Sequence, residues 1–244
     1  MPTAGNRFND AYRDHVAALE SRLETDAALR EAVGGEFVAV GKLTYYLLRS
    51  LGLADGHLVV DVGCGSGRLS VQLAHFKGIK YIGCDVVERL VDCASRLSNR
   101  PDWTFRVTDG HSIPCGNEAA DFVCFISVFT HLPHEDTFRY FRESARVLKS
   151  GGRLVFSFLE FRIPMHWCTF ISTVDSAAPG PHLNQFVDRE AIAAWAAHSG
   201  LEIVGLFDGD KPHIPIPEEI RWDNGARMGS FGNIGQSVAV LRKA

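Results

Sequence analysis

The sequence predicts an α/β fold in which helices cover both faces of a mostly parallel sheet. From residue 57 onward, short apolar runs alternate with segments of helical periodicity, which is the order expected for parallel strands joined by crossover helices. One junction, VVDVGCGSGRLS at residues 59–70, joins an apolar run to an amphipathic segment through three glycines. The chain has 244 residues, of which 46% are hydrophobic and 22% charged, so one such domain with additions can bury a core without disulfides.

Seven apolar runs are predicted to be strands, and four periodic segments are predicted to be helices. The runs are rich in Val, Ile and Phe, which favour strands, whereas the segments carry apolar residues at spacings of three and four. The predicted strands are residues 57–62, 80–85, 103–107, 120–126, 152–159, 201–207 and 236–243. The predicted helices are Arg68–Lys77, Glu88–Leu97, Glu135–Lys149 and Arg189–His198.

The remaining segments lie before and after this alternating core. Residues 1–55 are predicted to form an N-terminal helical extension to a domain of residues 56–244, because apolar residues recur at helical spacing as far as Gly52. Two stretches, residues 162–186 and 209–235, show no regular period and are predicted to be long loop insertions, which in compact domains are usually functional. The prolines of the second stretch favour extended segments.

The glycine-rich turn at residues 63–67 is the strongest functional signal. Glycines let the backbone turn sharply and approach a ligand without Cβ atoms in the way. A dinucleotide fingerprint, G-x-G-x-x-G, needs a third glycine where Arg68 stands, so an NAD(P)-dependent oxidoreductase is the less favoured interpretation. A glycine-rich turn without any ligand is the structural alternative.

The order of motifs resembles that of class I S-adenosylmethionine-dependent methyltransferases, especially their small-molecule branch. Asp61 followed by G-x-G-x-G resembles the first motif of that family, and RVLKSGGRLVFSF resembles its helix, turn and fifth strand. The resemblance covers roughly residues 57–160 and the final predicted strand. It implies a Rossmann-like sheet of seven strands, with an antiparallel last strand between strands five and six, and an N-terminal helical cap that closes over the cofactor.

The resemblance also implies S-adenosylmethionine as the cofactor, held at the carboxyl ends of the parallel strands. Asp85 is placed to accept hydrogen bonds from ribose hydroxyls, although an Asp at this position also suits a helix cap. Asp109 is expected beside the adenine amino group, although Asp109-Gly110 also suits a β-turn. The predicted cofactor-binding residues are Asp61, Gly63, Cys64, Gly65, Gly67, Asp85, Val86, Asp109, Gly110, Ile126 and Ser127.

His131, just beyond the fourth predicted strand, is the leading candidate for a catalytic base, because transfer to a hydroxyl is helped by a group that titrates near neutral pH. A loop-capping or packing role for His131 is the alternative. A metal site at His131 and His134 is disfavoured, since Pro133 prevents a regular helical presentation of both side chains. Secondary candidates for the active site are Lys42, Tyr45, His111, His166 and His213, and aromatic candidates for a substrate wall are Trp167, Phe170, Trp222 and Phe231.

Composition argues against several classes of partner. A net charge of −4 with scattered Lys and Arg gives no attraction to nucleic acid, and no apolar run approaches the length of a membrane span. The N-terminal segment has no secretory pattern, and the six cysteines contain no C-x-x-C pair, so a cytoplasmic protein with reduced thiols is expected. The oligomeric state is not predicted.

Taken together, the sequence predicts a methyltransferase that acts on a small molecule, at a hydroxyl oxygen of a natural product or saccharide. Ile126-Ser127-Val128-Phe129 stands where enzymes that methylate base amino groups usually carry an Asn- or Asp-Pro-Pro-aromatic sequence, which disfavours DNA. A domain that binds S-adenosylmethionine without catalysis is a further alternative to the oxidoreductase.

Overall fold

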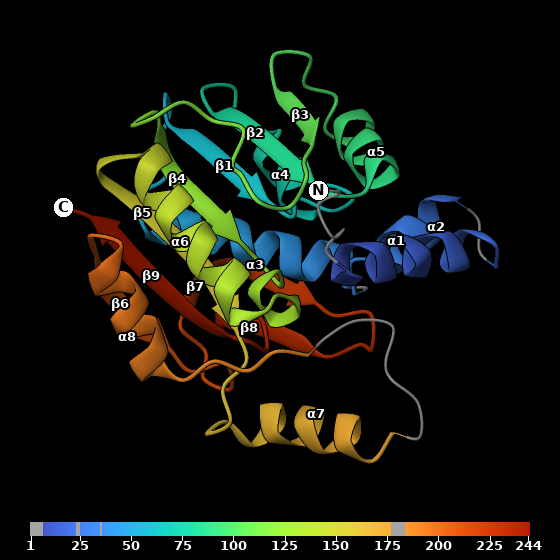
Figure 1. Cartoon of the computed structure of the whole chain (residues 1–244). Coiled ribbons are helices and arrows are strands. Elements are labelled where there is room, and N and C mark those ends of the chain that lie inside the picture. Colours follow the sequence, from blue (N-terminus) through green and yellow to red (C-terminus); the bar gives the residue numbers. More distant parts are fainter. Residues whose placement is uncertain (1–6, 23–24, 35, 177–183) are drawn as a thin grey trace, which may run out of the picture.

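The protein is built around one seven-stranded sheet in the order β3-β2-β1-β4-β5-β9-β6 (Figure 1). The computed structural model describes residues 7–22, 25–34, 36–176 and 184–244. β9 pairs antiparallel with β5 and β6, whereas the other neighbours are parallel. The strands are β1 (Leu58–Val62), β2 (Lys80–Asp85), β3 (Thr104–Val107), β4 (Ala120–Phe125), β5 (Leu148–Phe158), β6 (Leu201–Phe207) and β9 (Ser237–Lys243). The predicted fold class, including the antiparallel last strand between the fifth and sixth, is confirmed.

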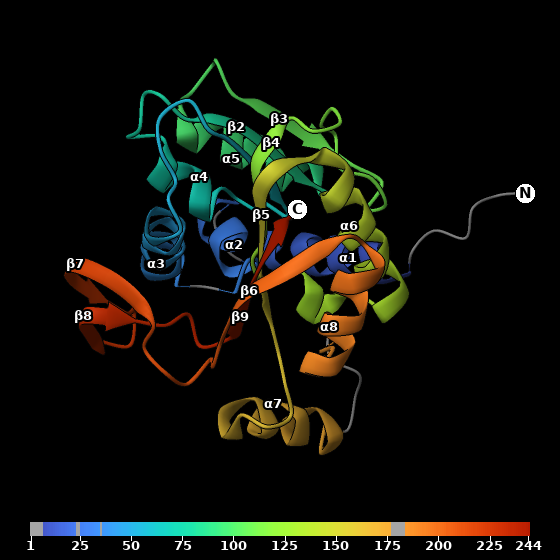
Figure 2. The same cartoon turned by 90° about the vertical axis from the view of Figure 1, so that its left-hand side faces the viewer.

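Helices cover both faces of the sheet, as predicted. On one face, α6 and α8 bury Phe141 and Ile192 against the sheet, together with the stacked rings of Phe125 and Phe129. On the other face, α3 and α4 pack a second cluster of Leu and Val side chains against the same strands. Figure 2 shows these two layers on opposite sides of the sheet. The helices are α3 (Phe37–Ser50), α4 (Arg68–Leu73), α6 (His134–Val147) and α8 (Arg189–His198), with a short 3₁₀ turn η1 (Phe129–His131) after β4.

The N-terminal helices lie beside the carboxyl end of β1 and β2. α1 (Arg7–Glu20) and α2 (Thr25–Glu31) pack through Val16 and Leu29 against Leu90 of α5 (Glu88–Ser98). An ion pair of 2.5 Å joins Glu20 to Arg89 at the edge of this contact. Within the predicted N-terminal extension, residues 1–6, 23–24 and 35 lie outside the described residues.

The two stretches predicted as irregular loops contain regular structure, so that prediction is wrong. The first holds α7 (Pro164–Val174), which starts with a proline, a residue compatible with the first helical position. The second holds the hairpin β7 (Ile214–Arg221) and β8 (Arg227–Gly232), which packs on α3 (Figure 2). In β7 the prolines alternate with buried isoleucines and point outward, so they do not interrupt the apolar face.

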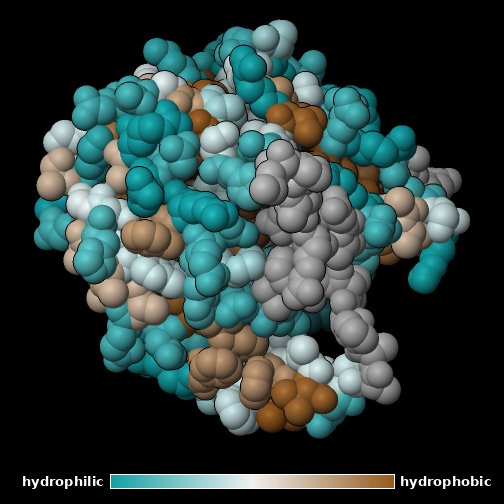
Figure 3. All heavy atoms as spheres, in the orientation of Figure 1, coloured by the Kyte–Doolittle hydropathy of each residue, from teal (hydrophilic) through white to brown (hydrophobic). Residues whose placement is uncertain are grey.

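α7 exposes most of its side chains. His166 is its buried residue, whereas Met165, Trp167 and Val174 are about half exposed or more. Figure 1 shows α7 set apart from the sheet, and Figure 3 shows apolar side chains gathered where it lies. The base of α7 is anchored by His166, whose Nδ1 accepts a hydrogen bond from the Glu160 amide at 3.1 Å and whose Nε2 lies 3.1 Å from the Gly235 carbonyl.

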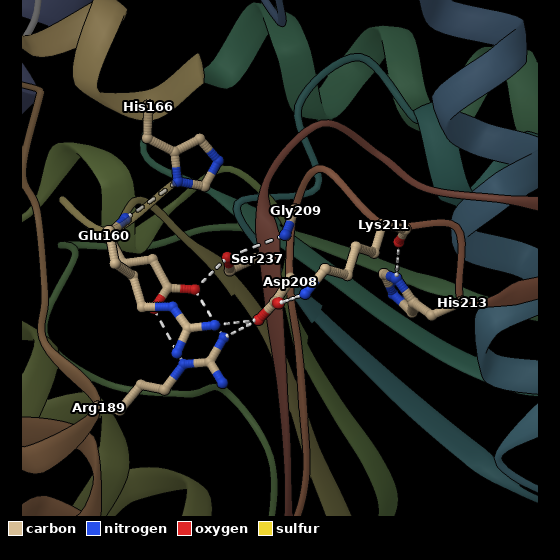
Figure 4. Close-up of polar contacts among 9 residues, drawn as sticks. Glu160, His166, Arg189, Asp208, Gly209, Lys211, His213 and Ser237 are labelled. Carbon is tan, nitrogen blue, oxygen red and sulfur yellow. Dashed lines mark hydrogen bonds and ion pairs between the residues drawn. The ribbon is translucent and has the colours of Figure 1, made fainter. Parts of the chain in front are cut away.

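A buried carboxylate ties together the elements beyond β5 (Figure 4). Glu160 is 1% exposed and accepts two hydrogen bonds from Arg189 of α8, at 2.9 and 2.8 Å. The Ser237 hydroxyl at the start of β9 donates to the same carboxylate at 2.5 Å, and Arg189 also reaches Asp208 at 2.6 Å. The network therefore joins the ends of β5, β6, β9 and α8.

We predict that Glu160→Ala lowers the free energy of unfolding by about 3 kcal/mol, because it leaves Arg189 without its bidentate partner in a mostly buried site. Urea denaturation measures this. The matched control is Glu202→Ala, which breaks an exposed pair with Arg242 and changes stability by less than about 1 kcal/mol. Equal effects of the two substitutions would contradict the prediction.

Candidate functional site

A cavity of about 380 Å³ lies at the carboxyl ends of β1, β2 and β4. The strand order reverses between β1 and β4 at this edge, and such a switch point is the usual ligand position in open α/β sheets. Of the predicted cofactor residues, Asp61, Gly63, Cys64, Gly65, Asp85, Val86, Gly110, Ile126 and Ser127 line the cavity.

The glycine turn forms the floor of the cavity, and its geometry excludes side chains. Gly63 and Gly65 have φ values of 73° and 53°, and a Cβ at either would come within 2.4 Å of Val128 or 2.5 Å of Val33. Gly67 differs, because it does not line the cavity. A Cβ there would come within 2.9 Å of the Ala94 Cα, so Gly67 allows the chain entering α4 to pack against α5.

Two buried acids stand on either side of the turn. Asp61 accepts a 2.7 Å hydrogen bond from the Tyr81 hydroxyl, and burial raises its pKa to about 6. Asp85 accepts from the Gly65 amide at 3.0 Å and from the Val87 amide at 3.1 Å. Burial raises the pKa of Asp85, while these amide hydrogen bonds oppose the increase. Asp85 therefore fixes the glycine turn and the approach to α5, and its predicted contact with a ribose stays a prediction.

Arg68 lines the cavity, although sequence reasoning treated it as a missing glycine. Its guanidinium donates to the Val33 carbonyl at 3.0 Å, and burial lowers its pKa while the negative charge of Asp61 opposes that change. The sequence did contain a signal for this position, because Arg68 directly follows the glycine turn and is the first residue of the following helix. Tyr12 of α1 also lines the cavity, and its hydroxyl donates to the Ala32 carbonyl at 3.3 Å.

The segment after β3 places only part of its predicted residues in the cavity. Thr108 and Gly110 line it, whereas Asp109 is exposed and lies outside the lining. The Asp109 carboxylate accepts a hydrogen bond from the His111 amide at 2.9 Å, which is the local turn that formed the alternative interpretation. The structure therefore does not bring the Asp109 side chain to the cavity.

The end of β4 is joined to β5 and β9 by a serine and glutamine cluster. Ser127 has a φ of 60°, and its amide donates to the Ser157 hydroxyl at 2.7 Å. The Ser157 hydroxyl donates to Gln236 Oε1 at 2.6 Å, and the Ser127 hydroxyl donates to the same atom at 3.3 Å. Gln236 lines the cavity but was predicted only as the first residue of a strand. Gln236 is placed in the cavity wall next to Ser127, a residue 109 positions earlier in the chain. Such a long-range contact leaves no pattern in the local sequence.

His131 lines the cavity from the end of η1, beside Leu132 and Tyr140. Its amide donates to the Val128 carbonyl at 2.9 Å, so the backbone of the turn fixes its position. Among the other predicted histidines, His111 is exposed and His166 anchors α7. His213 stacks on Phe207 with ring centroids 4.7 Å apart, and burial lowers its pKa.

Of the four aromatic candidates for a substrate wall, one lines the cavity and three do not. Trp222, in the turn of the β7–β8 hairpin, lines the cavity, but Trp167, Phe170 and Phe231 do not. Trp167 and Phe170 pack with Phe161 and Phe186 at α7 instead.

Two predicted residues of α3 also lie outside the cavity. Lys42 pairs with Glu218 of β7 at 2.7 Å, and Tyr45 packs edge-on against Tyr46 with ring centroids 5.0 Å apart. Both side chains thus make packing and ion-pair contacts of an amphipathic helix. α3 instead presents Val40 and Thr44 to the cavity.

The described part of the chain contains no cluster of three or more His, Cys, Asp or Glu arranged to hold a metal ion. Within the same residues, no helix has the length and apolar character needed to cross a membrane.

Comparison with known proteins agrees with this geometry. Residues 60–156 match a family described as a methyltransferase domain. The chain is 32% identical over 117 residues to methyltransferase GfsG of Streptomyces halstedii, covering 46% of the chain and 41% of the relative. It is 30% identical over 120 residues to 27-O-demethylrifamycin SV methyltransferase of Amycolatopsis mediterranei, covering 48% and 43%. The alignments thus span less than half the length of these two relatives.

The fold is shared with solved structures of low sequence identity. Magnesium protoporphyrin IX methyltransferase from Synechocystis PCC 6803, solved with bound SAH, superposes with a TM-score of 0.60 at 18% identity, covering 98% of this chain and 97% of that one. At this identity the likeness establishes the fold.

We predict that Gly65→Ala weakens binding of S-adenosylhomocysteine by at least about tenfold, because the new Cβ would displace Val33 from the cavity wall and strain a backbone at positive φ. Titration calorimetry measures the affinity. Gly56→Ala is the matched control, since Gly56 also has a positive φ of 85° but nothing within 4 Å of its Cβ position. A normal affinity in Gly65→Ala would contradict the assigned floor of the cavity.

A second prediction concerns pH. Asp61 loses its charge as the pH falls through about 6, so binding of a cationic ligand weakens on acidification. We expect the affinity for S-adenosylmethionine, which carries a sulfonium and an ammonium group, to fall about tenfold between about pH 7 and pH 5. Asp61→Asn keeps an oxygen for the Tyr81 hydroxyl but removes the titration. A pH dependence that persists unchanged in Asp61→Asn would assign it to another group.

Proposed function

Because the chain carries a class I S-adenosylmethionine-dependent methyltransferase domain, we propose that it transfers a methyl group to a hydroxyl oxygen of a small molecule. The observation that carries the proposal is that nine of the eleven predicted cofactor residues, all but Gly67 and Asp109, line one cavity together with His131. An acceptor and the cofactor would therefore meet in the same enclosed space.

The cavity suits S-adenosylmethionine in shape and charge. The bare backbone at Gly63 and Gly65 leaves room for a ligand that any Cβ would reduce. Asp61 and Asp85 offer negative charge to the cationic groups of the cofactor, and Arg68 offers a guanidinium to its carboxylate. The N-terminal segment of residues 1–55 is proposed to be the cap over this site, supported by Tyr12, Val33 and Thr44 in the cavity wall.

The proposed chemistry needs little from the protein beyond alignment and one proton transfer. When bound, S-adenosylmethionine supplies a methyl group already activated by the sulfonium. The chain's part is to hold the acceptor, exclude water and accept the hydroxyl proton, which we assign to the imidazole of His131. Leu132, Tyr140 and Trp222 line the same cavity and limit the access of water.

The acceptor class is proposed from the cavity and from the relatives' names. A space of about 380 Å³ suits a small molecule better than a folded macromolecule. The name of the Amycolatopsis relative specifies an oxygen position of a natural product. We place the acceptor of this chain among hydroxyl-bearing natural products or saccharides, and we propose a cytoplasmic location from the sequence pattern.

We predict that His131→Gln lowers kcat for methylation of a hydroxyl acceptor by about 10²-fold while leaving binding of S-adenosylhomocysteine unchanged. Catechol and labelled S-adenosylmethionine are the probes, and initial rates of label transfer are the readout. His111→Gln is the control, since His111 is exposed and outside the cavity. A full rate in His131→Gln would remove its role as base, and cofactor binding with no transfer in the parent chain would favour the non-catalytic alternative.

A further inference from the structure

The side-chain amide of Gln236 has a defined orientation. The Ser157 hydroxyl already accepts a hydrogen from the Ser127 amide at 2.7 Å, so its own hydrogen is available to donate. It donates to Gln236 Oε1 at 2.6 Å, and the Ser127 hydroxyl does so at 3.3 Å. The oxygen of Gln236 therefore faces the serines.

In this orientation the amide nitrogen of Gln236, Nε2, is not bonded to the serines. Gln236 lines the cavity and is partly exposed, and among the described residues Nε2 has no hydrogen-bond acceptor. Its two N–H groups are thus donors at the cavity wall, next to Ser127 at the end of β4. Donors at a cavity wall that have no acceptor within the described residues favour ligands that carry an accepting atom at that point.

We propose that Gln236 positions the methyl acceptor by donating a hydrogen bond to a second oxygen of that molecule, adjacent to the reacting hydroxyl. This inference rests on the proposed O-methyltransferase function. The acceptor class is accordingly a compound with neighbouring oxygens, such as a vicinal diol or an ortho-diphenol. His131 and Gln236 both line the cavity, and in this proposal the reacting hydroxyl faces His131 while the second oxygen faces Gln236.

The chemistry of the reaction favours the second oxygen over the reacting one. A hydrogen bond donated to the nucleophilic oxygen would occupy a lone pair and reduce its electron density, which opposes attack. The same bond to a neighbouring oxygen orients the molecule without that loss. A mono-hydroxyl compound would leave the Gln236 N–H groups unpaired in the cavity, and a site built to pair with a polar group discriminates against analogues that lack it.

The test compares matched acceptors in the purified full chain. The probes are catechol against phenol, and trans-cyclohexane-1,2-diol against cyclohexanol, each with labelled S-adenosylmethionine. Within at least one pair, we expect kcat/KM for the diol to exceed that for its mono-hydroxyl partner by about tenfold, the contribution of one hydrogen bond between neutral groups.

Two variants separate positioning from a structural role. Gln236→Glu keeps an oxygen for the hydroxyls of Ser157 and Ser127 but removes both N–H donors, so the preference for diols should fall towards unity. Ser157→Ala removes the hydrogen bond that holds Oε1 but keeps the N–H donors, so the preference should be retained in part. Thermal melting and binding of S-adenosylhomocysteine are measured for both variants, and positioning predicts little change in cofactor affinity.

The outcomes distinguish this inference from the proposed function. If S-adenosylhomocysteine does not bind, the proposed function fails and the inference fails with it. If it binds but no probe is methylated, or if diols show no advantage in the parent chain, the inference alone is overturned. An unchanged preference in Gln236→Glu also overturns it, because only the structural role of Oε1 would then remain.

Discussion

The structure depends on a turn that is held by hydrogen bonds from outside itself. The amides of Gly63 and Cys64 both donate to the Cys84 carbonyl, at 2.8 and 3.0 Å, and the Gly65 amide donates to the Asp85 carboxylate. The end of β2 thus satisfies three successive amides of the turn after β1. Because these amides are paired within the protein, the turn is fixed before any ligand arrives. The floor of the cavity, the start of α4 and the contact with the N-terminal helices all follow from its shape.

The fold and the half of the cavity formed at the ends of β1, β2 and β4 could be predicted because their signals are local. A parallel strand covered on both faces appears as an apolar run, and Val59, Val60 and Val62 are buried as that pattern requires. Strand ends bring their acids and glycines to one edge, so Asp61, Gly65 and Asp85 share the cavity without any further information. Asp109 lies between two residues that line the cavity, Thr108 and Gly110, but is itself outside the lining. The sequence pattern cannot distinguish which of three neighbouring turn residues faces a cavity.

The other half of the site could not be predicted because it is made by long-range contacts. Gln236 reaches the cavity only because β9 inserts between β5 and β6, and Trp222 reaches it only because the β7–β8 hairpin packs on α3. The hairpin segment looked irregular in sequence, since outward prolines and short strands give weak patterns. The final strand was predicted, but its sequence does not show that the residue at its start reaches the cavity. Arg68 was considered in the sequence only as the residue that replaces the third glycine of the dinucleotide fingerprint. No role was therefore predicted for its side chain.

The division between the two halves follows the boundary of the family match. Residues 60–156 contain the glycine turn, both acids, Ser127 and His131, whereas Ser157, Trp222, Ile234 and Gln236 lie after it. On the far side of the same segments, Ser237 donates to Glu160, so the residue next to Gln236 belongs to the buried ionic network. Neighbouring residues at the start of β9 thus serve stability and the cavity wall separately. A change at Gln236 can therefore alter the cavity wall while the network that holds β9, and the glycine turn at the cavity floor, stay as they are.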